Sequence, residues 1–169
     1  DEHYPPVLQS LDTFRRLVDQ IGPERVIWRY DPIVMSKATP PEYHQEAFSQ
    51  FASVLQGYTR RSVISLLDIY PKIRGRLRNM EAQGARLIPM GLAQPDEPGY
   101  QPAILRGLIQ ELVRISASCG MQLTSCGEGD MLKPFGVQPG KCIDDGLIRR
   151  LFGREVSQLK DPGQRATCG

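Results

Sequence analysis

Apolar and polar positions along the chain follow two kinds of spacing. The helical kind, with its stop signals, predicts helices over residues 11–21, 40–56, 72–83, 104–118 and 145–152. Glycines at or just beyond the ends of the first four are expected to terminate them. At the start of the second helix, Thr39 is placed as the N-cap, Pro40 suits the first position, and Glu42 completes a capping box.

Short runs rich in β-branched and apolar residues lie between these helices. They predict strands over residues 25–30, 62–69 and 121–125, with a weaker candidate over 86–90. The first strand is expected to end at Asp31-Pro32, because proline cannot donate to a sheet ladder. The run over 62–69 is almost continuously apolar, which is typical of a parallel strand covered on both faces. Residues 91–102 are predicted to be an irregular loop, and residues 138–140 a turn.

Alternating helices and strands predict an α/β fold built from parallel βα units, with the helices packed outside the sheet. A small doubly wound sheet and part of a barrel are both compatible with this order. A complete barrel needs about 250 residues, and the 169 residues supply three firm strands and one weak one. A barrel would therefore be a partial TIM-barrel-like section. We expect residues 1–169 to form a single α/β domain that is a section of a longer chain.

Composition narrows the class of protein. With 40% apolar residues and only four cysteines, the chain does not resemble disordered, collagen-like or disulfide-rich proteins. No apolar run approaches the roughly 18 residues of a membrane span, and the acidic, polar first residues do not resemble a signal peptide. We therefore expect a cytoplasmic protein without a membrane partner. A net charge of +2 gives no whole-chain reason to expect nucleic acid.

Polar residues stand at the predicted ends of three strands. Because ligands of parallel α/β folds bind beyond the carboxyl ends of the strands, these residues are candidates for a common rim. The predicted proton-transfer residues are Asp31, Asp68 and Glu128, and the predicted substrate-binding residues are Arg29, Tyr30, Tyr70 and Ser125. In the alternative interpretation, Asp31 and Asp68 cap turns and Arg29 pairs with one of them.

The remaining candidate ligands are cysteines and histidines. The cysteines contain no CxxC pair, and Cys119, at a helix end, is expected to be a buried small side chain. Cys126 and Cys142 lie in turn-rich segments near the rim, where their thiolates could reach a metal. Disulfides are disfavoured in the expected compartment. His3 and His44 have no histidine partner at metal-binding spacing, and both are expected to be surface residues.

Several of these segments occur together in one known family. They are Ile27 to Pro32, Ser65 with Asp68 and Tyr70, Ser125-Cys126 with Glu128, Cys142 to Asp144, and Lys160 to Arg165 ahead of Cys168-Gly169. In this order they resemble the bacterial domain of unknown function eighteen-forty-eight. Members of that family carry a C-terminal cysteine cluster similar to that of radical S-adenosylmethionine enzymes. The resemblance implies a full or partial βα barrel, and a 4Fe-4S cluster with S-adenosylmethionine in the full-length protein. It also implies that Cys168 belongs to the cysteine region, that most cluster ligands lie outside this chain, and that this chain alone holds no cofactor.

Three functions remain open. The chain can be the substrate-pocket section of a radical S-adenosylmethionine-like iron–sulfur protein, with a small-molecule substrate and the rest of its own chain as partners. It can be a cluster-independent barrel hydrolase or lyase in which Asp31 and Glu128 do acid–base work. It can also be a non-catalytic nucleic-acid-binding module that uses a basic run, although a solvated helix face explains that run as well. The run comprises Arg60, Arg61, Lys72, Arg74, Arg76 and Arg78.

Overall fold

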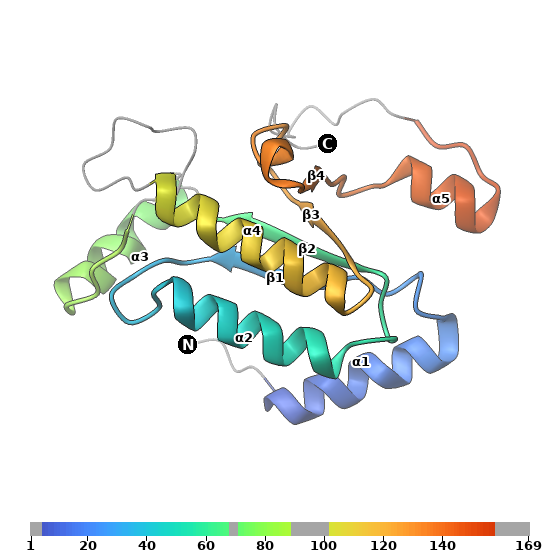
Figure 1. Ribbon diagram of the computed structural model, residues 1–169, viewed down its shortest axis with the longest axis horizontal. Helices are drawn as coiled ribbons and strands as arrows, with labels where there is room; N and C mark the ends of the chain where they lie inside the picture. Colours follow the sequence, from blue (N-terminus) through green and yellow to red (C-terminus); the bar gives the residue numbers. More distant parts are fainter. Residues whose placement is uncertain (1–4, 68–70, 89–101, 158–169) are drawn as a thin grey trace.

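The computed structural model describes residues 5–67, 71–88 and 102–157 as helices around a parallel sheet. The elements follow the chain in the order α1 (Val7–Ile21), β1 (Trp28–Ile33), α2 (Pro41–Val54), β2 (Arg61–Leu66), α3 (Pro71–Ala82), α4 (Pro102–Ser118), β3 (Gln122–Ser125), η1 (Lys133–Phe135), β4 (Gln138–Pro139) and α5 (Asp145–Phe152). Figure 1 shows the three longer strands side by side with α4 crossing over them. The predicted α/β fold of parallel βα units is confirmed.

The four strands lie in the sheet in the same order as in the chain, β1-β2-β3-β4, and every neighbouring pair is parallel. A doubly wound sheet reverses its strand order at a switch point, whereas a barrel wall keeps the sequential order. With right-handed crossovers, a sequential order places all connecting helices on the same face. The observed order therefore corresponds to a section of a βα barrel wall.

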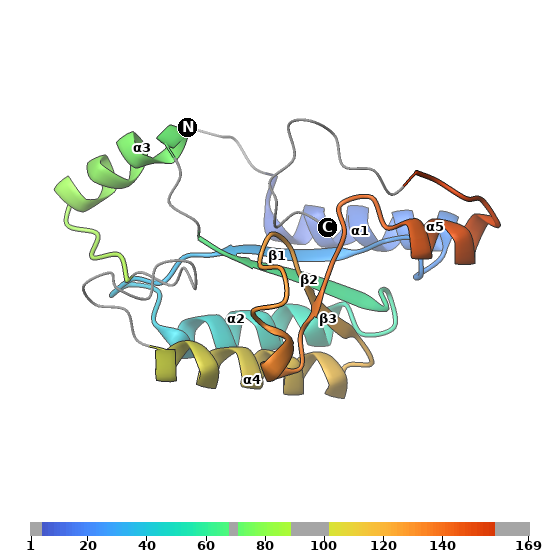
Figure 2. The same cartoon turned by 90° about the horizontal axis from the view of Figure 1, so that it is seen from above.

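Helices α2 and α4 cover one face of this sheet and pack against each other (Figure 2). Trp28 of β1 contacts Phe48 of α2, with 4.6 Å between the ring centroids. From α4, Ile109 and Leu112 are completely buried in the same core as Ile64 of β2. This face of the sheet, which we call the helix-covered face, carries most of the apolar burial.

The other face of the sheet, which we call the opposite face, carries different side chains because neighbours on a strand point to opposite sides. On β2, Ser62 is hydrogen-bonded to Ser116 of α4 and so points to the helix-covered face. Its neighbour Val63 lines a cavity together with Arg29 and Cys126. Both residues are buried, so β2 is covered on both of its faces at this point.

Most of the predicted elements are confirmed. Helix α5 has the predicted bounds, Gly22 ends α1, and the predicted apolar face of α2 is buried through Phe48 and Ala52. Strand β2 begins one residue before the predicted run and ends at Leu66, so that Leu67 lies outside it, and β3 begins one residue later than predicted. None of the helices in the described ranges combines the length and apolar character needed to cross a membrane.

Four local predictions are wrong. Strand β1 begins at Trp28, three residues later than predicted, and continues through the Asp31-Pro32 peptide, which is cis, to Ile33. Its register with β2 shifts between Tyr30 and Ile33. Proline is tolerated at such irregularities because no ladder donor is needed there. The predicted capping box does not form, since α2 begins after Pro40 and the Thr39 hydroxyl instead donates to the Val34 carbonyl at 2.6 Å.

The other two wrong predictions concern short strands. In the described part of the predicted strand 86–90, Leu87 makes an isolated antiparallel bridge to Ser36, so this segment adds no parallel strand. The predicted turn at residues 138–140 contains β4, which pairs with Thr124 and Ser125. Both errors arise because long-range pairing, rather than local propensity, decides the state of such short segments. The predicted loop over residues 91–102 lies outside the described residues except for Pro102, which begins α4.

Candidate functional site

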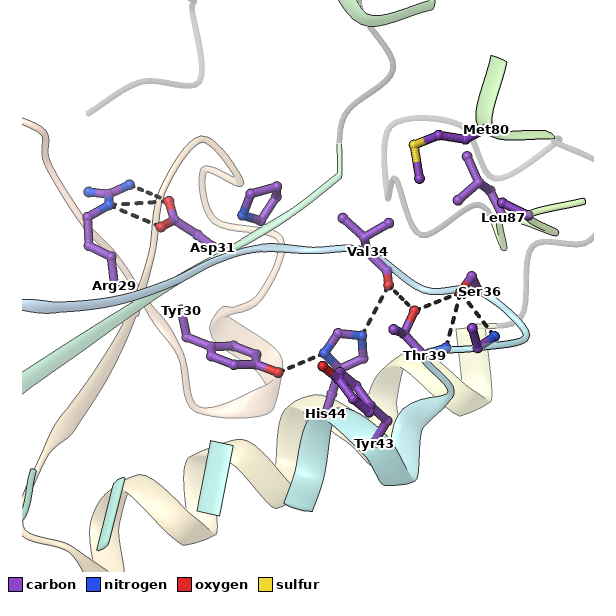
Figure 3. A pocket seen from close by; sticks show the side chains of 13 residues that line it. Arg29, Tyr30, Asp31, Val34, Ser36, Thr39, Tyr43, His44, Met80 and Leu87 are labelled. Carbon is purple, nitrogen blue, oxygen red and sulfur yellow. Dashed lines mark hydrogen bonds and ion pairs between the residues drawn. The ribbon is translucent and has the colours of Figure 1, made fainter. Parts of the chain in front are cut away.

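A pocket of about 610 Å³ lies at the carboxyl end of β1, where the sequence predicts a binding rim. We call it the β1-end pocket. Its lining comes from the end of β1, the segment that follows, the first turn of α2, and α3 with the turn behind it (Figure 3). Among the predicted site residues, Arg29, Tyr30 and Asp31 line this pocket. A volume of this size is within the range of small-molecule sites.

Arg29 and Asp31 form an ion pair on one side of β1 (Figure 3). The Arg29 Nη2 donates to Asp31 Oδ2 at 2.6 Å, and Nε donates to both carboxylate oxygens at 3.2–3.3 Å. Two residues on one strand, separated by a single position, point to the same face, which explains why they meet. The hydrogen bonds to Asp31, followed by contact with Cys126, raise the pKa of Arg29. The alternative in which Arg29 pairs with an aspartate at the rim is therefore observed.

Tyr30 lies on the other side of β1 and contacts His44 of α2 (Figure 3). The His44 Nε2 lies 3.1 Å from the Val34 carbonyl oxygen, which can only accept, so Nε2 carries a proton. Burial lowers the pKa of His44, and the ring is therefore neutral at pH 7, with Nδ1 as an acceptor. The Tyr30 hydroxyl accordingly donates to Nδ1 across 2.9 Å. Burial, with a smaller effect of Tyr43, raises the pKa of Tyr30 to about 12.

The expectation that His44 is a surface residue is wrong, because only 5% of it is exposed. The sequence contains a signal that could have placed it correctly. His44 precedes Phe48 by four positions, and Phe48 precedes Ala52 by four, so all three share one face of α2. A histidine on an apolar helix face is buried with that face. Here it holds the Tyr30 ring at the edge of the β1-end pocket.

Cys126 and Cys142 lie together on the opposite face of the sheet, and their Sγ atoms are 3.9 Å apart. They line a second cavity of about 210 Å³, which we call the cysteine cavity. Arg29 lines both this cavity and the β1-end pocket. The sequence predicted both cysteines near the rim, but it could not show that they are neighbours, because sixteen positions separate them.

Cys119 lies at the end of α4 and is buried in the core, as expected. Across the residues that the structure describes, no three or more His, Cys, Asp or Glu side chains form a group able to hold a metal ion. A 4Fe-4S cluster needs three or four cysteine thiolates. The described residues therefore do not fit such a cluster on their own, and their two neighbouring thiols supply at most part of a ligand set.

Glu128 is buried, and its Oε1 accepts a hydrogen bond from the Leu66 backbone N–H at 2.9 Å. This contact gives the last N–H of β2 an acceptor beyond the point where β3 ends. Glu128 is not among the residues that line the β1-end pocket, where Asp31 lies. Its predicted role in proton transfer stays a prediction, and the observed contact is a structural one.

Ser125 is 1% exposed, and its backbone carbonyl accepts from the Gly140 N–H at 2.7 Å. It lines the cysteine cavity rather than the β1-end pocket, so the structure separates it from Tyr30. The predicted site residues Asp68, Tyr70 and Cys168 lie outside the described residues, as does His3.

The basic residues considered for nucleic acid do not form one continuous patch. Arg61 stands at the first position of β2 and is paired with Asp144, whereas Arg74, Arg76 and Arg78 are exposed on α3, which follows the other end of β2. Figure 1 shows α3 and the start of β2 at opposite ends of the molecule. This arrangement agrees with a solvated helix face, and the nucleic-acid-binding module stays a prediction.

The fold and the two cavities define an α/β protein with a polar rim at the carboxyl end of its parallel strands. Comparison with known families adds one result: residues 1–169 match the family described as Domain of unknown function (DUF1848), and the chain belongs to this family. No curated protein and no solved structure matches the chain.

Proposed function

We propose that the β1-end pocket binds a small anionic molecule and that the chain forms the substrate-pocket section of a radical S-adenosylmethionine-like iron–sulfur protein. The observation that carries this proposal is the position of the pocket, at the carboxyl end of β1 in a sheet with the strand order of a barrel wall. In parallel βα folds this is where substrates bind.

Arg29 is the residue that best fits recognition of an anion. A guanidinium has five N–H donors, and the bonds to Asp31 use the one on Nε and one of the two on Nη2. Nearly half of the Arg29 side chain is exposed, at 47%, so a ligand can approach it. Asp31 holds the guanidinium in place, and a carboxylate or phosphate group can bind alongside this pair.

Tyr30 supplies a neutral polar group at the same pocket. Because its pKa is about 12, it stays protonated near pH 7, and His44 fixes the direction of its proton. Its oxygen then accepts a hydrogen bond from a ligand. The Tyr30 and His44 pair is therefore suited to orienting a substrate rather than to removing a proton from it.

The iron–sulfur part of the proposal depends on the rest of the protein. When bound, a 4Fe-4S cluster with one open iron site would hold S-adenosylmethionine and supply electrons to it. The cluster cysteines would come from outside the described residues, with Cys168 among those expected. No chemical step is assigned to Cys126 or Cys142 in this function.

Two measurements test the proposal separately. Anaerobic reconstitution of the full-length protein with iron and sulfide, followed by metal analysis and electron paramagnetic resonance, is expected to show a 4Fe-4S cluster, and the absence of any cluster would contradict that part. Binding of inorganic phosphate and of simple dicarboxylates, measured by calorimetry, is expected to weaken about tenfold or more in Arg29→Gln. Arg106→Gln is the matched control, because Arg106 lies on α4 against the Phe135 ring. Equal binding by both variants would contradict the pocket assignment.

Acid–base chemistry by Asp31 and Glu128 is less well supported by this geometry. It requires both carboxyl groups to face one ligand, whereas Glu128 is held in a buried hydrogen bond to the β2 backbone. The β1-end pocket itself is lined by Asp31 alone of the two. Substrate binding through Arg29 and Tyr30 needs no contribution from Glu128.

A further inference from the structure

Cys126 and Cys142 come from two segments that the sheet brings together. Cys126 directly follows β3, and Cys142 lies between β4 and α5. Their Sγ atoms are 3.9 Å apart in the reduced protein. Cys142 is exposed and Cys126 is half-buried, so a reagent in solution can reach the pair.

The backbone around the two cysteines is held on both sides. The Gly140 N–H donates to the Ser125 carbonyl oxygen at 2.7 Å, two residues before Cys142 and one residue before Cys126. A Cβ atom at position 140 would lie 2.8 Å from that same oxygen, closer than side chains are found, so this approach requires glycine.

On the other side of Cys142, two residues along the chain, Asp144 is fixed as well. Its carboxylate is paired with Arg61 of β2 and also caps α5 by accepting from the Leu147 N–H at 2.8 Å. Cys142 is therefore enclosed between two anchored positions, 140 and 144. The short distance between the two thiols is a consequence of this anchoring and does not depend on a long, unattached loop.

We propose that Cys126 and Cys142 form a reversible intramolecular disulfide by exchange with a low-molecular-weight disulfide of the glutathione type. A disulfide requires the two sulfur atoms to approach to about 2.05 Å. From 3.9 Å, the two Sγ atoms therefore have to approach by about 1.9 Å. This function is separate from the proposed binding of an anion in the β1-end pocket.

The exchange proceeds in two balanced steps. The Cys142 thiolate attacks one sulfur of the small disulfide, which forms a mixed disulfide and releases one small thiolate. The Cys126 thiolate then attacks the Cys142 sulfur, which forms the protein disulfide and releases the second small thiolate. The protein loses two electrons and two protons, and the small disulfide gains both, becoming two thiols. The first attack is assigned to Cys142 because it is the more accessible of the two.

Arg29 connects this pair to the β1-end pocket. The cysteine cavity and the β1-end pocket share Arg29 in their linings, and Cys126 is the second contributor, after Asp31, to the raised pKa of Arg29. Formation of the disulfide removes the thiol that Arg29 contacts. The redox state of the pair therefore alters the surroundings of the one cation that both cavities share.

Incubation of the full-length protein with oxidised glutathione, followed by proteolysis and mass spectrometry, tests the proposal. The expected product is a peptide pair joined through Cys126 and Cys142, and dithiothreitol should reverse it. Cys126→Ser should stop the reaction at a glutathione adduct on Cys142. The variant Cys119→Ala should form the crosslink at the wild-type rate, since Cys119 lies in the core at the end of α4 and takes no part. Two separate glutathione adducts without a crosslink, or pairing with Cys119 or Cys168 at equal yield, would overturn the proposal.

Gly140→Ala probes the geometry of the same step. The new Cβ would displace the segment that carries Cys142, so the mixed disulfide should persist about tenfold longer or more before Cys126 resolves it. Gly107→Ala is the glycine control, because Gly107 is an exposed residue of α4 with ordinary helical backbone and no atom within 4 Å of an added Cβ. Circular dichroism identifies any variant that has lost its fold. Unchanged closure in a folded Gly140→Ala protein would show that the anchoring does not position the pair.

Discussion

The two faces of the sheet differ in what their side chains do. On the helix-covered face, Phe48 and Leu112 are completely buried, and aromatic and aliphatic side chains fill the space between the sheet and α2 and α4. On the opposite face, Arg29 is paired with Asp31, and Cys126 lies beside Cys142. Burial of apolar area stabilises a fold far more than partly exposed ion pairs do. The comparison indicates that the helix-covered face determines stability, whereas the opposite face supplies Arg29 to the β1-end pocket and carries the two thiols of the cysteine cavity.

The sharpest test of this division is a truncation on the helix-covered face. Leu112→Ala should lower the free energy of unfolding by about 2–5 kcal/mol, because it removes buried contacts and leaves a cavity in the core. Urea denaturation measures the change. Leu8→Ala is the control, since Leu8 is 81% exposed and its truncation should change stability by less than about 0.5 kcal/mol. Similar effects of both variants would contradict the assigned role of this face.

A smaller loss of stability is expected from a substitution near the amino ends of the strands. Asp144→Ala removes the N-cap of α5 and the partner of Arg61, and should cost about 1–2 kcal/mol. Burial alone would raise the pKa of Asp144, but Arg61, the Leu147 N–H and Lys141 together lower it. The contribution of the carboxylate is therefore present at neutral pH and is lost as the pH falls below about 3.9. Asp130→Ala, at an exposed ion pair with Lys133, should cost less than about 0.5 kcal/mol.

Lowering the pH should reduce stability through His44, which belongs to the helix-covered face. Because burial lowers its pKa, the unfolded chain binds a proton more readily than the folded protein as the pH falls below about 6.5. Stability should decrease by at most about 1.4 kcal/mol between about pH 7.5 and 5.5 from this group. Urea titrations at several pH values measure the slope. His44→Gln should have a shallower slope, and an unchanged slope would show that another group titrates.

The smallest effect on stability is expected on the opposite face. Asp31→Asn should change the free energy of unfolding by less than about 1 kcal/mol, because its partner Arg29 is half exposed and solvent screens the pair. Thermal and urea denaturation measure the change. A loss above about 2 kcal/mol would contradict the different roles of the two faces, since it would show that the opposite face also determines stability.

Sequence patterns predicted the helix-covered face well because a single physical signal controls it. The spacing of Leu108, Leu112 and Ile115 marks the buried side of α4, and all three are buried. Strand β2 was also predicted, because Val63, Ile64 and Leu66 are β-branched or apolar residues typical of a buried strand, and all three are buried. Apolar burial marks many residues of such an element, so a prediction that misses one or two residues at its ends still identifies the element.

The candidate site was predictable only in part. Arg29, Tyr30 and Asp31 were found because they follow the apolar start of a strand, and the rule for parallel folds places strand ends together. The Cys126 and Cys142 pair was not found, because it depends on β4, a two-residue strand with no local signal. His44 was assigned to the surface because it has no histidine partner at metal-binding spacing, although its position relative to Phe48 indicated burial.

The hydrogen bond from Leu66 to Glu128 has a consequence for how this sheet can change over evolutionary time. One carboxylate oxygen takes the place that a backbone carbonyl of β3 would occupy, so the last N–H of β2 keeps an acceptor after β3 has ended. The residues after Cys126 therefore do not need to continue the hydrogen-bond ladder with β2. Substitutions can therefore accumulate at exposed positions of this segment, such as Asp130, Met131 and Lys133, without leaving the β2 N–H unpaired, whereas Leu132 and Val137 are completely buried in the core.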